Sequence, residues 1–169
     1  MYKRQGFVLS KGALTTKSGG EGDIRKALIE ARMVDCIVNL PAKLFLNTQI
    51  PASLWFLTRE KTRRRDEILF IDARNLGHLI NRRTLELSEE DTSTIADTYS
   101  AWQKSNEAFE DIKGFCKSAS VEDVAKLDYV LAPGRYVGLA EIEDDFDFNE
   151  RFTSLKADFD AQLLSLIHI

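Results

Sequence analysis

A dense run of basic residues is the first group of side chains in this sequence whose chemistry stands out. It consists of Arg59, Lys61, Arg63, Arg64 and Arg65. Guanidinium and ammonium groups bind phosphates, and each phosphate contact adds affinity that falls as the salt concentration rises. Two interpretations fit the run: it contacts nucleic-acid phosphates, or it forms the solvated tip of a hairpin. Its position between two apolar segments favours the hairpin tip.

Residues for other kinds of chemistry are sparse. The cysteines Cys36 and Cys116 and the histidines His78 and His168 form no CxxC or metal-ligand spacing, so we expect reduced thiols and no metal site. No Ser-His-Asp, Cys-His or paired-carboxylate grouping is apparent. Four acids that might suggest a cation site lack the spacing of a calcium loop, and we expect them to be solvated. They are Asp72, Glu141, Asp144 and Asp145.

Three glycines stand before a predicted helix, where glycine-rich loops sometimes cradle phosphates. Two acids stand among and after these glycines, in the order Gly19, Gly20, Glu21, Gly22 and Asp23. Carboxylates in the first turn of a helix repel an anion from its positive end. The glycines are therefore interpreted as a loop and cap.

The composition sets limits on the class of protein. The 169 residues are 44% hydrophobic and 30% charged, with a formal net charge of -4. This allows one domain, or a core with a dependent extension, and any DNA contact must come from local patches. No apolar run approaches the roughly 18 residues of a membrane helix, and no signal peptide is visible, so we expect a cytoplasmic protein. The abrupt ends favour an interior piece of a longer protein over a complete small protein.

The first half of the chain has the pattern of an α/β sheet. Segments 6–9, 20–32 and 33–40 predict strand, helix and strand, a unit of the right length for a parallel crossover. Ser18 and Glu21 have capping-box spacing. The apolar stripe of this helix is expected to pack on the sheet. It comprises Ile24, Ala27, Leu28 and Ala31.

Two more strands are predicted at 52–58 and 67–72. The residues between them are too few for a parallel return, which needs a dozen or more. The spacing therefore predicts two antiparallel neighbours and an antiparallel edge on the sheet.

The second half is predicted to contain helices. Ser88 with Asp91 has capping-box spacing, and so has Ser120 with Asp123. The first of these helices is expected to bury Ile95, Tyr99 and Trp102. Segment 115–119 is a weaker candidate for a strand, and Pro133 and Gly134 interrupt the chain afterwards.

The last part combines acids with a regular apolar pattern. The acidic run from Glu141 to Asp147 indicates a solvated connector. A heptad-like seam then predicts a final helix, which buries that seam against its own domain or against a partner. The seam comprises Phe148, Phe152, Leu155, Phe159 and Leu163.

Three stretches together resemble a known family. They are the acid-capped helix and strand in 20–40, the pattern LPAKLFLNTQIPASLWFL in 40–57, and the segment YVLAPGRYVG in 129–138 with its acidic run. In this order and spacing they resemble the carboxy-terminal part of the modification subunit of type I restriction-modification systems, an N6-adenine DNA methyltransferase. The resemblance covers nearly the whole chain from residue 6 to about residue 163.

The resemblance implies the carboxy-terminal part of a Rossmann-like sheet with an antiparallel last strand, followed by a mostly helical extension. Domain limits are expected at 6–75 for the catalytic-domain part, 76–138 for the extension, and 139–169 for the connector and terminal helix. In the family, S-adenosylmethionine binds a glycine-containing loop and the target amine binds an Asn-Pro-Pro-aromatic motif. The sequence contains no NPP, so no catalytic or cofactor-binding residue is assigned in this chain.

The resemblance also implies a residue that stacks on the target base. In related adenine methyltransferases an aromatic residue just before the last hairpin holds the flipped base, and Phe45 has that place. The alternative is that Phe45 fills the core beside its leucine neighbours. For Arg135 a structural clamp is favoured over a DNA contact. The candidates for contact with DNA are Phe45, Asn47, Thr48, Gln49, Arg63, Arg64, Arg65 and Arg135.

The sequence thus predicts a fragment of a site-specific adenine-N6 DNA methyltransferase subunit, inactive alone. Its partners would be DNA and the specificity and restriction subunits, with the terminal helix as the candidate for docking the specificity subunit. No membrane contact is expected. The alternative is a non-catalytic interaction protein whose half-sheet is completed by a partner chain.

Overall fold

The computed structural model describes residues 4–45, 49–59, 64–104 and 109–139, with residues 152, 153 and 156. Their elements follow one another along the chain as β1 (Arg4–Ser10), η1 (Lys11–Leu14), η2 (Ser18–Gly20), α1 (Glu21–Glu30), β2 (Val34–Asn39), β3 (Ala52–Thr58), β4 (Glu67–Asp72), β5 (His78–Asn81), β6 (Thr84–Glu86), α2 (Glu89–Lys104), β7 (Cys116–Ser120), α3 (Val121–Lys126) and η3 (Pro133–Arg135).

A five-stranded mixed sheet with the order β1-β3-β2-β4-β7 forms the centre of the fold. β2 and β4 are parallel, while β3 runs antiparallel between β1 and β2, and β7 runs antiparallel beside β4. This confirms an α/β sheet with an antiparallel strand. β1 and β2 run in the same direction, but they are not neighbours, because β3 lies between them.

The predicted antiparallel pairing of β3 with β4 is wrong. β3 returns beside β2 and pairs with β1 on its other side, so the connection to β4 passes across β2. The run from Arg59 to Arg65 is therefore no hairpin tip. Residues 60–63 of that run lie outside the described residues.

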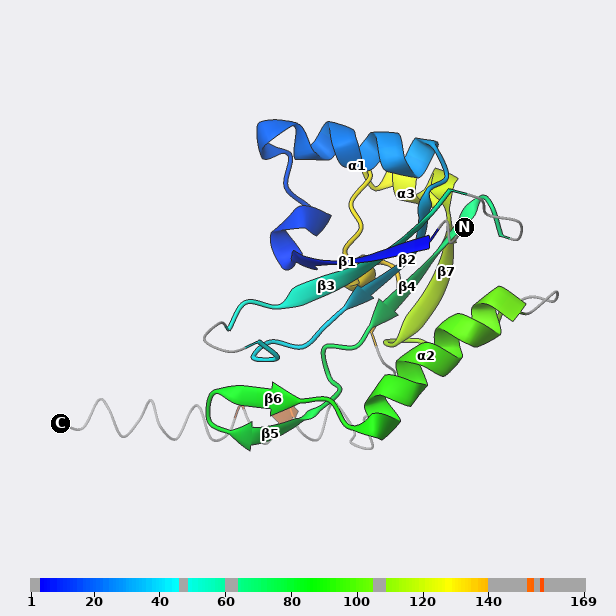
Figure 1. The fold of residues 1–169 in the computed structure, drawn as a ribbon. Coiled ribbons are helices and arrows are strands. Elements are labelled where there is room, and N and C mark those ends of the chain that lie inside the picture. Colours follow the sequence, from blue (N-terminus) through cyan, green and yellow to red (C-terminus); the bar gives the residue numbers. More distant parts are fainter. Residues whose placement is uncertain are drawn as a thin grey trace.

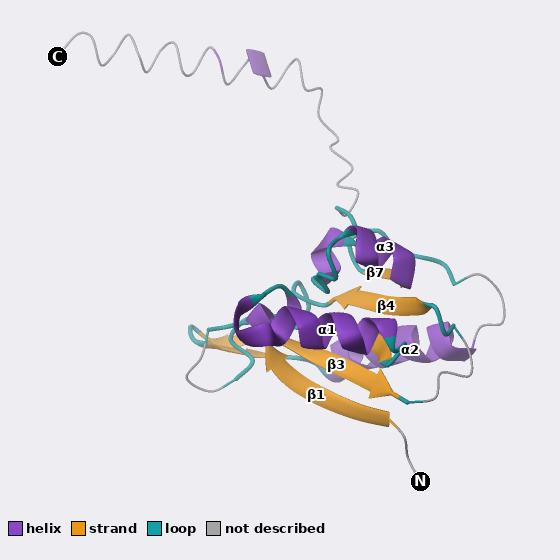
Figure 2. Ribbon diagram, turned by 90° about the horizontal axis from the view of Figure 1, so that it is seen from above, coloured by secondary structure: helices purple, strands orange, loops and turns teal. Residues whose placement is uncertain are grey.

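Helices cover both faces of the sheet. Figures 1 and 2 show α1 and α3 on one face and α2 on the other. Ile37, Trp55 and Phe70 belong to the apolar cluster on the α1 side, whereas Leu69 and Trp102 belong to the cluster on the α2 side. β2 is buried at every residue, which fits its mostly apolar sequence, although Asp35 and Asn39 are buried with it.

The start and the buried face of α1 differ from the prediction. The helix begins at Glu21 after Gly20, which makes no side-chain cap, and Ser18 lies in a separate 3-10 turn. The buried residues are Arg25 and Ile29, while Ile24 is 63% exposed. Arg25 turns inward because its guanidinium donates to the backbone carbonyl oxygens of three residues outside α1. They are Tyr129 at 2.8 Å, Ala13 at 3.1 Å and Thr16 at 2.9 Å.

Both capping boxes of the second half are confirmed. Asp91 N donates to Ser88 Oγ at 3.1 Å and Ser88 N to Asp91 Oδ2 at 2.9 Å, and Ser120 Oγ accepts from Asp123 N. The apolar face of α2 is as predicted, with Trp102 buried. The Tyr99 hydroxyl on this helix donates to Asp35 of β2 at 2.6 Å.

A mostly helical extension after residue 75 is not found. The described residues there include the β5–β6 hairpin and β7, which belongs to the central sheet. The predicted connector and terminal seam lie outside the described residues, apart from Phe152, which is exposed. Within the described ranges, no helix has the length and apolarity needed to cross a membrane.

Candidate nucleic-acid interface

The carboxyl ends of β2 and β4 meet at one edge of the sheet, named here the carboxyl edge. Asn39 and Asp72 are partners in the parallel register, and Ala73 N donates to Asn39 O at 2.9 Å. Ligands of open α/β sheets bind beyond the carboxyl ends of the strands. The segment with Phe45 leaves β2 here, and the chain to the β5–β6 hairpin leaves β4 here (Figure 1).

A bidentate ion pair lies at this edge. Arg74 Nη2 contacts Asp72 Oδ2 at 2.6 Å and Arg74 Nε contacts Asp72 Oδ1 at 2.7 Å. The hydrogen bond that Arg74 donates to Asp72 raises the pKa of Arg74. A Cβ on Gly134 would lie 3.1 Å from Arg74 Nη2 and 3.4 Å from Asp72 Oδ2, so the turn at η3 packs closely over the pair. Arg74 thus neutralises Asp72, the acid at the carboxyl end of β4.

Phe45 is exposed at the carboxyl edge. Its side chain is 42% exposed, whereas Leu44 packs against the apolar cluster on the α2 side. Core filling is therefore the task of Leu44, and the interpretation of Phe45 as a core residue does not hold. Gln49 is exposed as well. Asn47 and Thr48 lie outside the described residues.

Arg64 and Arg65, just before β4, lie at the opposite end of the sheet from Phe45. Arg64 Nη1 contacts Glu67 Oε2 at 2.8 Å, and its guanidinium carbon lies 5.7 Å from the centre of the Trp102 ring. Its side chain is only 13% exposed, so Arg64 has structural contacts. Arg65 is exposed beside it, and Arg63 lies outside the described residues. Arg64 and Arg65 therefore do not share a surface with Phe45.

The segment from Pro133 to Tyr136 is held against the sheet by its tyrosine. The Tyr136 ring stacks on Phe70 at 3.9 Å between centroids, and its hydroxyl donates to Val130 O. Burial raises the pKa of Tyr136. Tyr136 is thus a structural clamp, while Arg135, beside Gly134, is exposed.

Three stretches of the chain that reach the carboxyl edge lack carboxylates, a pattern that sequence reasoning missed, although Asp72 and the acidic first turn of α2 lie beside them. Residues 36–59, 73–85 and 129–140 contain no Asp or Glu, although the chain has 27 of them. The same segments contribute Lys43, Arg82, Arg83 and Arg135. A count of acids along the sequence would have revealed the pattern, but only the topology places these segments at one edge.

The glycines before α1 do not fit S-adenosylmethionine. Gly19 and Gly20 have φ values of 63° and 82°, and a Cβ on either would meet no atom within 4 Å. They allow a turn, and nothing there requires close approach of a ligand to the backbone. Glu21 and Asp23 occupy the first helical turn, where they disfavour the carboxylate of the cofactor.

An apolar groove of about 420 Å³ lies on the other side of the sheet, between β1 and α1. Phe7, Leu9, Ile24, Leu28 and Trp55 line much of it. β1 is exposed at every residue, which is unusual for a strand with this apolar sequence. The groove and β1 form an uncovered edge of the sheet.

Comparison with known proteins identifies the family. The model of the N-6 DNA methylase family matches residues 3–145. The chain belongs to this family.

Relatives of this N-6 DNA methylase chain are type I methylase subunits. The HindI methylase subunit of Haemophilus influenzae is 48% identical over 152 residues, which are 89% of this chain and 34% of the relative. The MjaIX methylase subunit of Methanocaldococcus jannaschii is 45% identical over 84% of this chain and 25% of its own length. The chain therefore spans between a quarter and about a third of these relatives.

A solved structure shares the fold. The methyltransferase subunit of a type I restriction-modification system from Streptococcus thermophilus is 32% identical, with a TM-score of 0.69. The similarity covers 80% of this chain and 26% of that subunit. The mixed sheet described above thus matches the fold of a type I methyltransferase subunit.

Proposed function

We propose that this chain is the DNA-contacting part of an adenine-N6 DNA methyltransferase subunit of a type I restriction-modification system. The observation that carries the proposal is the exposed Phe45 at the carboxyl edge, where neighbouring segments contribute the basic residues Lys43 and Arg135. The likeness to type I methylase subunits supports it. The target sequence in DNA is left to the specificity subunit.

Phe45 stacks on the flipped adenine in this proposal. A base that reacts outside the duplex loses its stacking neighbours, and an aromatic face replaces them with about 1–3 kcal/mol per base. Asn47, Thr48 and Gln49 follow in the chain and contact the displaced base or the backbone. Arg135 at the same edge contacts a phosphate. Arg64 is left out because it is held by Glu67 and packs beside Trp102.

S-adenosylmethionine supplies the methyl group in the intact enzyme. The glycines before α1 do not fit the cofactor, and we propose that the part of the subunit that relatives have beyond the matched segment binds it. The chain alone is then expected to neither bind the cofactor nor transfer methyl groups. Isothermal calorimetry with S-adenosylmethionine checks this: tight, stoichiometric binding by the chain would contradict the proposal.

The uncovered edge at β1 supports a larger assembly. Phe7, Leu9 and Ile24 are exposed around the groove, as expected where further strands and side chains of the same subunit pack. The same feature suits the alternative of an interaction protein completed by a separate chain. The specificity and restriction subunits are the proposed partners in the type I complex, with the segment 148–163 as the candidate docking helix.

A chimeric enzyme tests the role of Phe45. This chain replaces the matching segment of the HindI methylase subunit, and methyl transfer to that enzyme's DNA is measured with a labelled cofactor. Phe45→Ala should lower methyl transfer roughly ten- to hundredfold, because the stacking contact is lost. Phe45→Trp should keep most of it.

The matched control is Ile112→Ala, which removes another half-exposed apolar side chain, 52% exposed, beside β7. It should leave methyl transfer unchanged. Equal activity of Phe45→Ala and the starting chimera would refute the stacking role. Full activity of Phe45→Ala together with normal DNA binding would mean that another side chain holds the flipped base.

A further inference from the structure

The β5–β6 hairpin projects from the carboxyl edge outside the central sheet. Every residue of β5 is exposed, and the two strands pair only with each other. Two-stranded hairpins are marginally stable on their own, so an anchor is needed. Figure 1 shows the hairpin beside the end of the sheet from which the Phe45 segment departs.

Lys43 is that anchor. Leu85 N donates to Lys43 O at 2.9 Å, and Lys43 Nζ donates to Arg82 O at 3.4 Å. Lys43 has a φ of 66°, a left-handed conformation that directs its carbonyl group toward the hairpin. Because Lys43 precedes Phe45 by two residues, the hairpin is held in a fixed relation to the proposed base-binding side chain.

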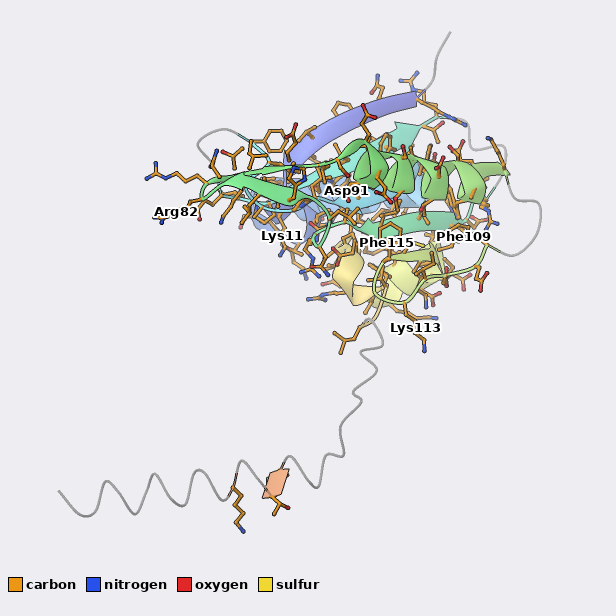
Figure 3. All side chains as sticks on the ribbon, turned by 90° about the horizontal axis from the view of Figure 1, so that it is seen from below. Lys11, Arg82, Asp91, Phe109, Lys113 and Phe115 are labelled. Carbon is orange, nitrogen blue, oxygen red and sulfur yellow. The ribbon has the colours of Figure 1, made fainter. Side chains whose placement is uncertain are left out.

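The hairpin separates its charges along its length. Arg82 and Arg83 occupy the turn, where Asn81 Oδ1 accepts from Arg83 N at 2.8 Å. Its acid, Glu86, is in register with His78 at the other end. In the described part of the chain, neither arginine forms an ion pair. Figure 3 shows Arg82 at the periphery of the molecule, on the side away from Lys113.

We infer that the β5–β6 hairpin is a DNA-backbone clamp, in which Arg82 and Arg83 bind phosphates flanking the base held by Phe45. Guanidinium groups suit phosphate oxygens, and contacts of this kind set the register of a protein on DNA without reading sequence. A hairpin held in a fixed place therefore positions the flipped base against the segment that carries Phe45. The inference rests on the proposed function and adds the hairpin to Phe45 as a second part of the chain that contacts DNA.

Leu79 and Ile80 in β5 are 58% and 54% exposed, so a protein partner is the competing occupant. The charge favours DNA. The hairpin turn and its anchor carry Lys43, Arg82 and Arg83, whereas Glu86 and the acidic first turn of α2 lie at the other end of the hairpin. The chain as a whole has a net charge of -4, so this surface is a local exception.

Binding of the full chain to a short fluorescein-labelled duplex, followed by anisotropy at several salt concentrations, tests the clamp. The double variant Arg82→Ala/Arg83→Ala should bind several-fold more weakly. Its slope of log affinity against log salt should fall by about 2, because two phosphate contacts are lost. Arg82→Lys/Arg83→Lys should retain most of the slope, since the charges remain.

Lys113→Ala/Lys117→Ala is the matched control, because it removes the same charge around β7. It should keep the affinity and slope of the unmutated chain. If both alanine doubles weaken binding equally, bulk charge explains the effect and the clamp is wrong. If the arginine double binds like the unmutated chain, the clamp is wrong while the proposed function stands.

Two further outcomes are informative. No binding by the unmutated chain at low salt contradicts the proposed function and the clamp together. If the arginine double binds DNA normally but no longer assembles with a specificity subunit, the hairpin is a protein contact and the inference is overturned. Circular dichroism melts of all variants should coincide, because the arginines are exposed.

Discussion

The two ends of β2 and β4 both carry arginines, yet the arginines at each end have different surroundings. At the amino end, Arg64 contacts Glu67 and Arg32 contacts Asp66 at 2.6 Å. At the carboxyl end, Arg82 and Arg83 have no carboxylate on their hairpin turn. The difference teaches that arginines in one chain are not equally available: Arg32 and Arg64 are held by acids, whereas Arg82 and Arg83 are the ones we propose to bind phosphates.

The largest expected difference in DNA binding is between two variants, each of which removes one carboxylate at one end of the sheet. Asp72→Asn releases Arg74 at the carboxyl edge and should strengthen DNA binding several-fold, with a salt slope about 1 unit steeper. Glu67→Gln makes the same charge change at the amino end and should leave DNA binding unchanged. Anisotropy titrations of both variants measure the contrast. Equal gains in affinity would remove the distinction between the two ends.

A glycine at the base of the hairpin offers a second test. Gly77 has a φ of 88°, and a Cβ there would lie 2.4 Å from Leu85 Cδ2 and 2.8 Å from Glu86 O. Gly77→Ala should therefore cost the hairpin about 1–2 kcal/mol or more and weaken DNA binding. The main melting transition should move little, because the hairpin lies outside the sheet. A collapse of the whole fold would show that the hairpin is part of the core.

A substitution at the amino end should lower the stability of the fold and leave DNA binding unchanged. Arg64→Ala removes an ion pair and a cation–π contact with Trp102, so the free energy of unfolding should fall by about 1 kcal/mol. Its DNA binding should match that of the unmutated chain. Urea unfolding and anisotropy together check this. Weaker DNA binding with an unchanged free energy of unfolding would show that Arg64 contacts DNA and has no structural role.

The smallest effect concerns the capping box of α2, next to the hairpin. Hydrogen bonds from Ser88 lower the pKa of Asp91. A carboxyl with a lowered folded-state pKa contributes stability above its unfolded pKa of about 3.9, and loses it as the pH falls through the lower, folded-state value. Asp91→Asn should thus lower the urea midpoint near neutral pH, but little in strong acid. Glu90→Gln, an exposed acid in the same turn, should change it less.

Local signals allowed much of the fold to be predicted. β3 and β4 have the predicted limits, and both capping boxes form, because strand length and helix caps depend on neighbouring residues. The pairing of β3 was not predictable in this way, since insertion between β1 and β2 depends on distant segments. The face of α1 was missed because Arg25 satisfies three backbone carbonyl groups of residues outside α1.

The candidate site was predicted only in part. Phe45 was selected by family resemblance, and the structure adds its exposure and the separate packing of Leu44. The hairpin was not predicted, because the strands of three and four residues are too short for a clear alternating pattern. The role of the carboxyl edge depends on topology, which brings together segments that are far apart in sequence.

Hydrogen exchange of the chain with and without duplex DNA, read by mass spectrometry, tests the central claim most directly. We expect slower exchange in the peptides covering Leu40–Phe45 and Gly77–Glu86, and no change in peptides covering Arg64–Glu67. Protection at Arg64–Glu67 with none at the carboxyl edge would contradict this claim.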